Sequence, residues 1–263
     1  AKIIKSRKGK IFLKSKVIGI NFKNNKIVSV CVQKKNLVKI FKCTHVISTM
    51  PIKDLIKSIK GKKIPKNIYK ISNNLPYRDF ITIGLLIKKL HIKTGNKFLK
   101  KIKDNWIYVQ EKSVKLGRIQ IFNNWSPYLV KDKNKIWLGL EYFCNENDEI
   151  WKMNDNKITN FAINELCSIN FIKEEDVIIS KVVRVKKAYP AYFGSYNQFN
   201  LIKKFINKID NLYLIGRNGM HKYNNQDHSM LTAMQAVENI NSNTKNKNNI
   251  WSINTEDEYH EEK

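Results

Sequence analysis

Near the end of the chain, two glycines are followed by a run of polar side chains. Gly216 and Gly219 come first, and polar residues dominate from 221 to 228. Glycine lets a backbone approach a ligand closely because it carries no Cβ. The pattern therefore predicts a site for an anionic or electron-rich ligand. His228 beside Asp227 is a candidate proton relay, and it is equally a candidate loop residue bonded to a backbone carbonyl.

A strand before these residues and a helix after them must position such a site. The apolar run over 212–215 predicts a short buried strand. Apolar residues then return at helical spacing over 229–240, which predicts a helix capped by Asp227 or Ser229. The unpaired N–H groups of the helix start, and the dipole behind them, favour negative charge at the ligand.

This strand, glycine loop and helix resemble the C-terminal FAD-contacting segment of flavoproteins related to amine oxidases, protoporphyrinogen oxidase and UDP-galactopyranose mutase. The resemblance implies an FAD cofactor whose flavin pyrimidine edge lies over the helix start. N–H groups from Ser229 to Leu231 would then stabilise charge on the reduced ring. The cofactor-binding residues implied here are Gly216, Arg217, Asp227, His228, Ser229, Met230 and Leu231.

The early part of the chain has the alternation of an antiparallel β-meander that returns to a nucleotide-binding sheet. Its strands are expected near 11–13, 17–22, 27–33 and 38–42, followed by a short β-branched strand over 46–49. The same alternation occurs in any antiparallel sheet. The resemblance implies that Val17 touches the adenine through its backbone and that Met50, at the end of the last strand, lies near the cofactor.

The middle of the chain reads as an inserted substrate domain. Strands are expected over 79–90, 105–110, 118–123, 135–142 and 177–185, with a helix over 155–166. The predicted fold class is α/β with an α+β insert. A Rossmann-like FAD-binding domain would be formed by residues 1–57 and 186–240, the antiparallel substrate domain by 58–185, and a polar and acidic tail by 241–263.

The candidate substrate-binding residues lie on both sides of the expected return to the cofactor domain. Arg184 suits an anionic substrate group, and Tyr189 suits a pocket wall. A surface ion pair and a tyrosine at the core edge are the plainer alternatives. The loop is also partly similar to that of the galactopyranose mutases, where a Gly-Arg pair and a tyrosine-rich loop help hold a sugar nucleotide. That similarity adds Tyr223, Asn224 and Asn225.

The glycine-rich GxGxxG turn that holds the pyrophosphate in such flavoproteins does not occur in this sequence. We therefore expect the chain to be the C-terminal portion of a longer protein, or a degraded copy of one. The alternative is a whole protein that binds no dinucleotide.

Composition narrows the class of protein further. The 263 residues carry a formal net charge of +27, but of 49 basic residues all except five are lysines, spread along the chain among many Asn and Ile residues. Because base readout and bidentate phosphate contacts use arginine, no specific nucleic-acid partner is predicted. The four cysteines show no CxxC spacing, and no apolar run reaches eighteen residues. We expect no metal, no transmembrane segment and a cytoplasmic location.

These observations favour an FAD-dependent oxidoreductase of the amine oxidase-like group that transfers hydride from a small-molecule substrate. No side chain is assigned as a catalytic acid or base, and the substrate and oligomeric state are left open. The alternatives are a mutase-like flavoenzyme that acts on a nucleotide sugar, and an inactive scaffold or basic interaction module.

Overall fold

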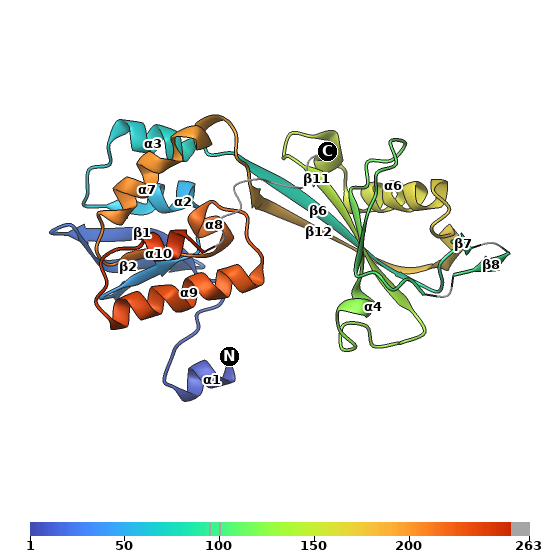
Figure 1. Ribbon diagram of the computed structural model, residues 1–263, viewed down its shortest axis with the longest axis horizontal. Coiled ribbons are helices and arrows are strands. Elements are labelled where there is room, and N and C mark those ends of the chain that lie inside the picture. The colour runs from blue at the N-terminus through green and yellow to red at the C-terminus, as the bar shows by residue number, and fades with distance from the viewer. Residues whose placement is uncertain (95, 100, 254–263) are drawn as a thin grey trace. The chain divides into compact units, whose positions relative to one another are not determined.

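The computed structural model describes residues 1–94, 96–99 and 101–253 of a mixed α/β chain (Figure 1). The chain forms two compact units. Unit 1 consists of Ala1–Pro76 and the described residues from Tyr189 onwards, and unit 2 is Tyr77–Ala188. The boundaries between the units therefore fall after residues 76 and 188. The sequence predicted the corresponding domain boundaries after residues 57 and 185. Which unit holds a cofactor and which a substrate stays a prediction.

The meander of unit 1 forms a four-stranded sheet in the order β3-β2-β1-β5. Strands β1, β2 and β3 are antiparallel, and β5 pairs with β1 in parallel. Asn24 and Asn25 form the two-residue turn between β1 and β2, with φ of 48° and 62°, as a tight hairpin requires. The bounds are Lys16–Lys23 for β1, Lys26–Lys34 for β2, Leu37–Lys42 for β3 and Ile59–Lys60 for β5.

A second, smaller sheet of unit 1 contains β4, Val46–Ser48, and β13, Leu212–Leu214. The two strands are parallel, with Leu212 opposite Val46 and Leu214 opposite Ser48. Every residue of β13 is buried, as its apolar run predicted. Two segments distant in the sequence thus run side by side and end at the same edge.

The helices of unit 1 are mostly ones that the sequence reading did not predict. In Figure 1, α2, α3 and α7 lie above β1, and α9 lies below it. Helix α3 packs against α2 and α7, which is why residues 58–76 belong to unit 1. The bounds are Lys2–Ser6 for α1, Ile52–Ser58 for α2, Lys66–Asn73 for α3, Gly194–Gln198 for the 3₁₀ helix η2, Phe199–Asn207 for α7, Gly216–Met220 for α8, Gln226–Asn241 for α9 and Asn248–Trp251 for α10.

One prediction for unit 1 is wrong. The strand expected near 11–13 does not form, and those apolar side chains are exposed. In the polar tail expected from residue 241 onwards, Lys247 and Trp251 contact the rest of unit 1. The Lys247 ammonium donates to the carbonyl of Ile209 over 2.5 Å, and the Trp251 indole N–H donates to Asn207 over 3.1 Å. The acidic tail predicted further on, residues 254–263, lies outside the described residues.

Unit 2 is organised around a five-stranded sheet in the order β12-β6-β11-β10-β9. In the run β6, β11, β10 and β9, each strand is antiparallel to its neighbour, and Leu140 of β11 lies opposite both Ile83 and Ile119. All five strands were predicted, with ends shifted by up to five residues. Their bounds are Tyr77–Ile87 for β6, Trp106–Tyr108 for β9, Arg118–Ile121 for β10, Ile136–Cys144 for β11 and Val177–Pro190 for β12.

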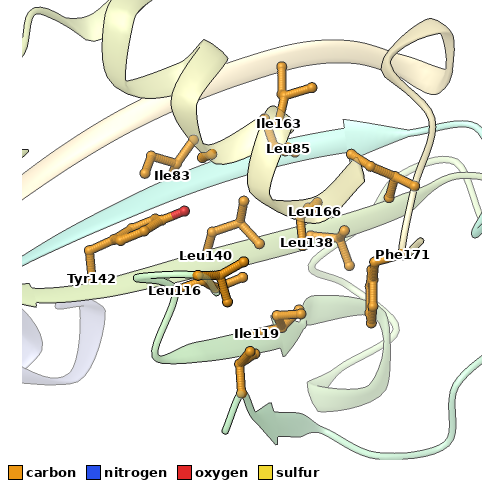
Figure 2. Packing of buried hydrophobic residues seen from close by; sticks show 14 of the residues in the cluster. Ile83, Leu85, Leu116, Ile119, Leu138, Leu140, Tyr142, Ile163, Leu166 and Phe171 are labelled. Atoms are coloured by element: carbon orange, nitrogen blue, oxygen red, sulfur yellow. The ribbon is translucent and has the colours of Figure 1, made fainter. Parts of the chain in front are cut away.

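The core of unit 2 lies between one face of this sheet and helix α6, Asp155–Ser168. Figure 2 shows Leu138 and Leu140 of the sheet and Leu166 of the helix packed together, all with no measurable exposure. The smaller elements of the unit are β7 at Lys93–Thr94, β8 at Lys97–Phe98, α4 at Phe122–Trp125, α5 at Glu149–Lys152 and the 3₁₀ helix η1 at Glu174–Asp176.

The buried carboxylate of Glu165 is fully engaged inside this core. It accepts hydrogen bonds from the backbone N–H groups of Lys115 and Leu116, at 2.5 and 3.1 Å, and from the Tyr142 hydroxyl at 2.9 Å. Burial, reinforced by the neighbouring Glu165 carboxylate, raises the pKa of the Tyr142 hydroxyl, so this tyrosine stays protonated. The charge in the core therefore has a structural role.

Candidate functional site

The parallel pairing of β4 and β13 brings two chain segments to one edge of the small sheet. The N–H of Ile215 donates to the carbonyl of Ser48 over 3.1 Å, so the two strands stay paired to their last residues. Ser48 also accepts from the backbone N–H of Met50, with 3.3 Å between the Ser48 Oγ and the Met50 nitrogen. In open α/β sheets ligands bind outside the carboxyl ends of the strands.

The two glycines act at this edge for different reasons. A Cβ on Gly219 would lie 2.5 Å from the carbonyl oxygen of Ser48 and 3.1 Å from the Cα of Thr49, so only glycine lets α8 pack on the end of β4. Gly216 has space around it but a φ of +69°, which glycine adopts without strain. Both glycines lie in the short helix α8, where the sequence predicted a polar loop.

The N–H of Gly216 is already used within the protein. It donates to the Oγ1 of Thr232 over 3.1 Å, and the Thr232 hydroxyl donates to the carbonyl of Ser229 over 2.8 Å. Thr232 is fully buried. The contact fixes the first turns of α9 against the start of α8. The N–H of Gly216 is therefore not available to a ligand, and the role of Gly216 is to position the two helices.

Helix α9 begins at Gln226, three residues before the expected start, with Asn225 as its N-cap. The backbone N–H of Asn225 donates to the ring Nδ1 of His228 over 3.4 Å, which closes a capping box. The N–H of Ser229 already bonds the carbonyl of Asn225. The first-turn N–H groups that face outward along the helix dipole are therefore those of Gln226 and Asp227, and not the Ser229–Leu231 groups expected.

Arg217 lies against a stacked pair of aromatic rings beside this helix start. Its guanidinium carbon lies 4.8 Å from the ring centre of Tyr189 and 4.9 Å from that of Tyr223. Its Nε donates to the carbonyl of Asn224 over 3.0 Å. A guanidinium oriented in this way presents a planar, permanently charged group, which suits an anionic partner.

The loop between α8 and α9 is rigidly supported. The Asn224 side chain is buried and accepts from the Ser229 hydroxyl over 2.9 Å, and the backbone N–H of Tyr223 donates to the Tyr192 hydroxyl oxygen. A surface hollow of about 520 Å³ opens here. It is lined by Arg217, Asn224, Asn225, Gln226, Ser229 and Met230.

His221 is a structural residue that the sequence reading did not single out. It is fully buried and adopts a left-handed backbone with φ of 48°. Its Nε2 lies 3.2 Å from the carbonyl oxygen of Ala191, and its ring lies against Tyr196 and Phe199. Burial lowers the pKa of His221 to about 4, so the imidazole is neutral at pH 7. Its tight packing supports the turn between α8 and α9.

Asn211 is the second residue that sequence reasoning missed, because a polar residue before an apolar run looks like a strand boundary. Its buried side chain accepts from the N–H of Ile27 at 3.0 Å and donates to the carbonyls of Ile27 and Thr44 at 2.8 and 2.7 Å. Its own carbonyl accepts from the N–H of Val46. Asn211 thus ties the large sheet of unit 1 to the small one.

Asn218 in α8 carries a buried side-chain oxygen, Oδ1, for which the described residues provide no hydrogen-bond partner. Unsatisfied buried acceptors are rare in folded proteins and cost about 1–3 kcal/mol each. The group lies one residue from both Arg217 and Gly219, within the same short helix. It is therefore an acceptor suited to a ligand N–H at the strand-end site, which we define as Ser48–Met50, Gly216–Met220 and Asn225–His228.

The other predicted site residues are distributed over the two units. Val17 lies in β1, in the large sheet of unit 1, next to a β-bulge. Arg184 lies on β12 of unit 2 and forms an ion pair with Asp155 at 2.5 Å, while also donating to the carbonyl of Met153. Met230 and Leu231 are exposed on α9. The roles assigned to them stay predictions.

Within the described ranges 1–94, 96–99 and 101–253, no cluster of three or more His, Cys, Asp or Glu side chains is arranged for a metal ion. The part of the chain that the structure describes also contains no helix that is long and apolar enough to cross a bilayer.

Comparison of the sequence with protein-family models and with curated proteins gives no match. The fold, in contrast, matches solved structures. A reduced UDP-galactopyranose mutase superposes with a TM-score of 0.75 at 22% identity, over 94% of this chain and 51% of the mutase chain. A putative protoporphyrinogen oxidase from Exiguobacterium sp. 255-15 superposes with a TM-score of 0.58 at 12% identity, over 88% of this chain and 48% of that chain.

This chain therefore shares its fold with a UDP-galactopyranose mutase and a putative protoporphyrinogen oxidase, two kinds of protein that the resemblance named. The chain spans about half the length of each of them.

Proposed function

We propose that this chain supplies the flavin-contacting edge and the substrate unit of an FAD-dependent oxidoreductase. The observation that carries the proposal is the strand-end site. It combines two parallel strands that end together, a glycine contact that admits no side chain, and the start of a sixteen-residue helix. The superposition over 94% of the chain on a reduced UDP-galactopyranose mutase supports it.

The residues present fit a flavin. The outward N–H groups of Gln226 and Asp227 at the start of α9 suit a carbonyl that gains negative charge on reduction. The buried Oδ1 of Asn218 suits a ring N–H. The bound FAD would supply the hydride chemistry, while the protein orients it and tunes its charge. Val17 and Met50 are assigned to the same cofactor.

The substrate residues are assigned by charge and by shape. Arg217 sits next to the α9 start and would hold an anionic group of the cofactor, and Arg184 would hold one of the substrate. Tyr189, Tyr223 and Asn225 would border the bound ligand, and the buried Asn224 would position them. A cytoplasmic location is part of the same proposal.

A mutase that acts on a nucleotide sugar through reduced flavin is the second candidate. The TM-score favours it, at 0.75 for the mutase against 0.58 for the putative oxidase. Arg217 beside the stacked rings of Tyr189 and Tyr223 could also hold a sugar nucleotide phosphate. An inactive scaffold, the third candidate, would bind no flavin.

An anaerobic titration separates these candidates. The longest natural polypeptide that contains this sequence is purified and its visible absorbance is followed. We expect flavin bands that bleach on addition of a reducing organic substrate. Turnover of a nucleotide sugar only after dithionite reduction would favour the mutase, and a colourless protein that takes up no added FAD would contradict both.

Two arginine variants test the assignment of cofactor and substrate roles. Arg217→Met removes the charge beside the helix start and should weaken FAD binding by about tenfold or more, because charge-assisted hydrogen bonds contribute about 1.5–3 kcal/mol. The matched Arg184→Met variant should leave FAD affinity unchanged and raise KM for an anionic substrate. Fluorescence titration of the flavin measures the first effect, and equal losses in both variants would contradict the assignment.

A further inference from the structure

Unit 2 contains a cavity that neither the cofactor nor the substrate assignment uses. It has a volume of about 280 Å³ and is lined by residues from β10, α4 and the start of β11. The buried part of its lining consists of Leu90, Ile121 and Val130, which are 3%, 3% and 8% exposed. No residue assigned to the flavin or to the substrate lines it. Its interior therefore suits a small apolar group that leaves water on binding.

Two neighbouring asparagines of α4 hold the walls of this cavity in place. The Asn123 amide donates to the carbonyl of Lys135 over 2.8 Å, and its oxygen accepts from the N–H of Trp137 over 2.9 Å. The Asn124 amide donates to the carbonyl of Ile102 over 2.9 Å. These bonds tie α4 to the start of β11 and to the segment before β9. The cavity is therefore preformed, and the amide N–H groups of both asparagines are used by the protein itself.

The charges on the lining are of one sign. Lys101 and Lys133 line the cavity and are exposed, and neither forms an ion pair within the described part of the chain. Among the described residues, the lining includes no aspartate or glutamate. A lysine can lay its methylene stem along an apolar surface while its ammonium group stays in water. The two charges therefore belong to the mouth of the cavity, where they suit the anionic end of a ligand whose other end is apolar.

We propose that this cavity binds a medium-chain alkyl carboxylate. The alkyl chain occupies the apolar interior beside Leu90, Ile121 and Val130, and the carboxylate pairs with the ammonium groups of Lys101 and Lys133. A phosphate head group fits less well, because no arginine is present in the described lining to form a bidentate contact. The small volume favours a chain such as that of octanoate over a long fatty acid.

Calorimetric titration of the longest natural polypeptide that contains this sequence tests the proposal, with octanoate, hexanoate and octanol as probes. We expect saturable binding of octanoate. Hexanoate should bind about tenfold more weakly, because it buries two fewer methylene groups. Octanol should also bind about tenfold more weakly, because it carries no charge to pair with the lysines. Octanoate that does not saturate, or equal affinities for the three probes, would overturn the proposal.

Two pairs of lysine variants locate the head group. Lys101→Met combined with Lys133→Met should weaken octanoate binding about tenfold and leave octanol binding unchanged, so that the two probes bind equally well. Lys112→Met combined with Lys181→Met is the matched control, because both lysines are exposed in unit 2 and do not line the cavity. The control pair should leave both affinities unchanged. Equal losses in the two pairs would reflect the overall charge of the protein and would overturn the site.

A third variant locates the alkyl chain. Val130→Phe fills the interior and should weaken octanoate and octanol binding alike, at least tenfold, while the near-ultraviolet circular dichroism shows that unit 2 is folded. Unchanged affinity in the folded variant would overturn the proposal. Should Val130→Phe not fold, the lysine pairs decide alone, since all four of those side chains are exposed. Heat of binding is read without reference to the flavin, so the result is independent of the proposed flavin function.

Discussion

The two units of this protein both have apolar cores, but they use buried polar groups differently. Unit 2 has a continuous apolar core between a five-stranded sheet and α6, and its buried Glu165 is hydrogen-bonded within that core. Unit 1 also buries apolar side chains, among them Leu55 and Ile206, and adds a close backbone contact at Gly219 and the buried polar tie of Asn211 between its two sheets. In unit 1, these backbone and polar contacts lie beside the candidate site, so substitutions there should affect both stability and the site.

The largest expected effect lies in the core of unit 2. Leu140→Ala should lower the free energy of unfolding of that unit by about 4 kcal/mol, because a fully buried leucine leaves a cavity when it is truncated. Ile179→Ala, on an exposed position of the same sheet, should change it by about 0.5 kcal/mol or less. Denaturant unfolding with tryptophan fluorescence measures both. Equal losses of stability in the two variants would contradict the claim that the core around Leu140 stabilises unit 2.

The next effect tests backbone fit in unit 1. Gly219→Ala places a Cβ 2.5 Å from the Ser48 carbonyl and should cost about 3 kcal/mol by overpacking against backbone. Gly194→Ala is the control. It also lies in unit 1 with a φ of +60° but has nothing within 4 Å, so it should cost about 1 kcal/mol from backbone strain alone. Chemical denaturation compares the two, and a larger loss at Gly194 would contradict the role of the close contact.

A smaller effect should appear in the pH dependence of unit 1. Burial lowers the pKa of His221 from 6.5 to about 4 in the folded protein. As the pH falls below 6.5, the unfolded chain therefore takes up a proton at this histidine before the folded protein does, and the free energy of unfolding decreases. This histidine should account for a loss of about 2 kcal/mol between pH 7.5 and pH 5. His221→Gln should remove that part of the slope. Stability curves for the two proteins that stay parallel over this range would contradict the buried, neutral imidazole.

Much of the fold could be predicted from periodicity. The strands β1, β2 and β6 and the helix α6 follow alternation or helical spacing that burial of one face requires. The helices α2, α3 and α7 were missed because Lys and Asn are dense there and mask the apolar stripe. The strand predicted near 11–13 failed for the opposite reason, since its apolar residues have no sheet to join in the described chain.

The candidate site was predicted in part. Glycines, a strand and a helix could be located from residue types, but the helix start could not, because Asn225 and His228 form a cap that depends on side-chain geometry. Sequence also could not show that the Gly216 N–H is taken by Thr232, sixteen residues later. Long-range polar contacts such as those of Asn211 leave no periodic signal.

The most direct test of the central claim is the amount of FAD bound by the longest natural polypeptide that contains this sequence. The protein is saturated with FAD, freed of excess cofactor and denatured, and the released flavin is quantified by chromatography against protein concentration. We expect about one FAD per chain for the natural protein and much less for Gly219→Ala. Absence of bound FAD under saturating conditions would contradict the claim that the strand-end site is part of a flavin site.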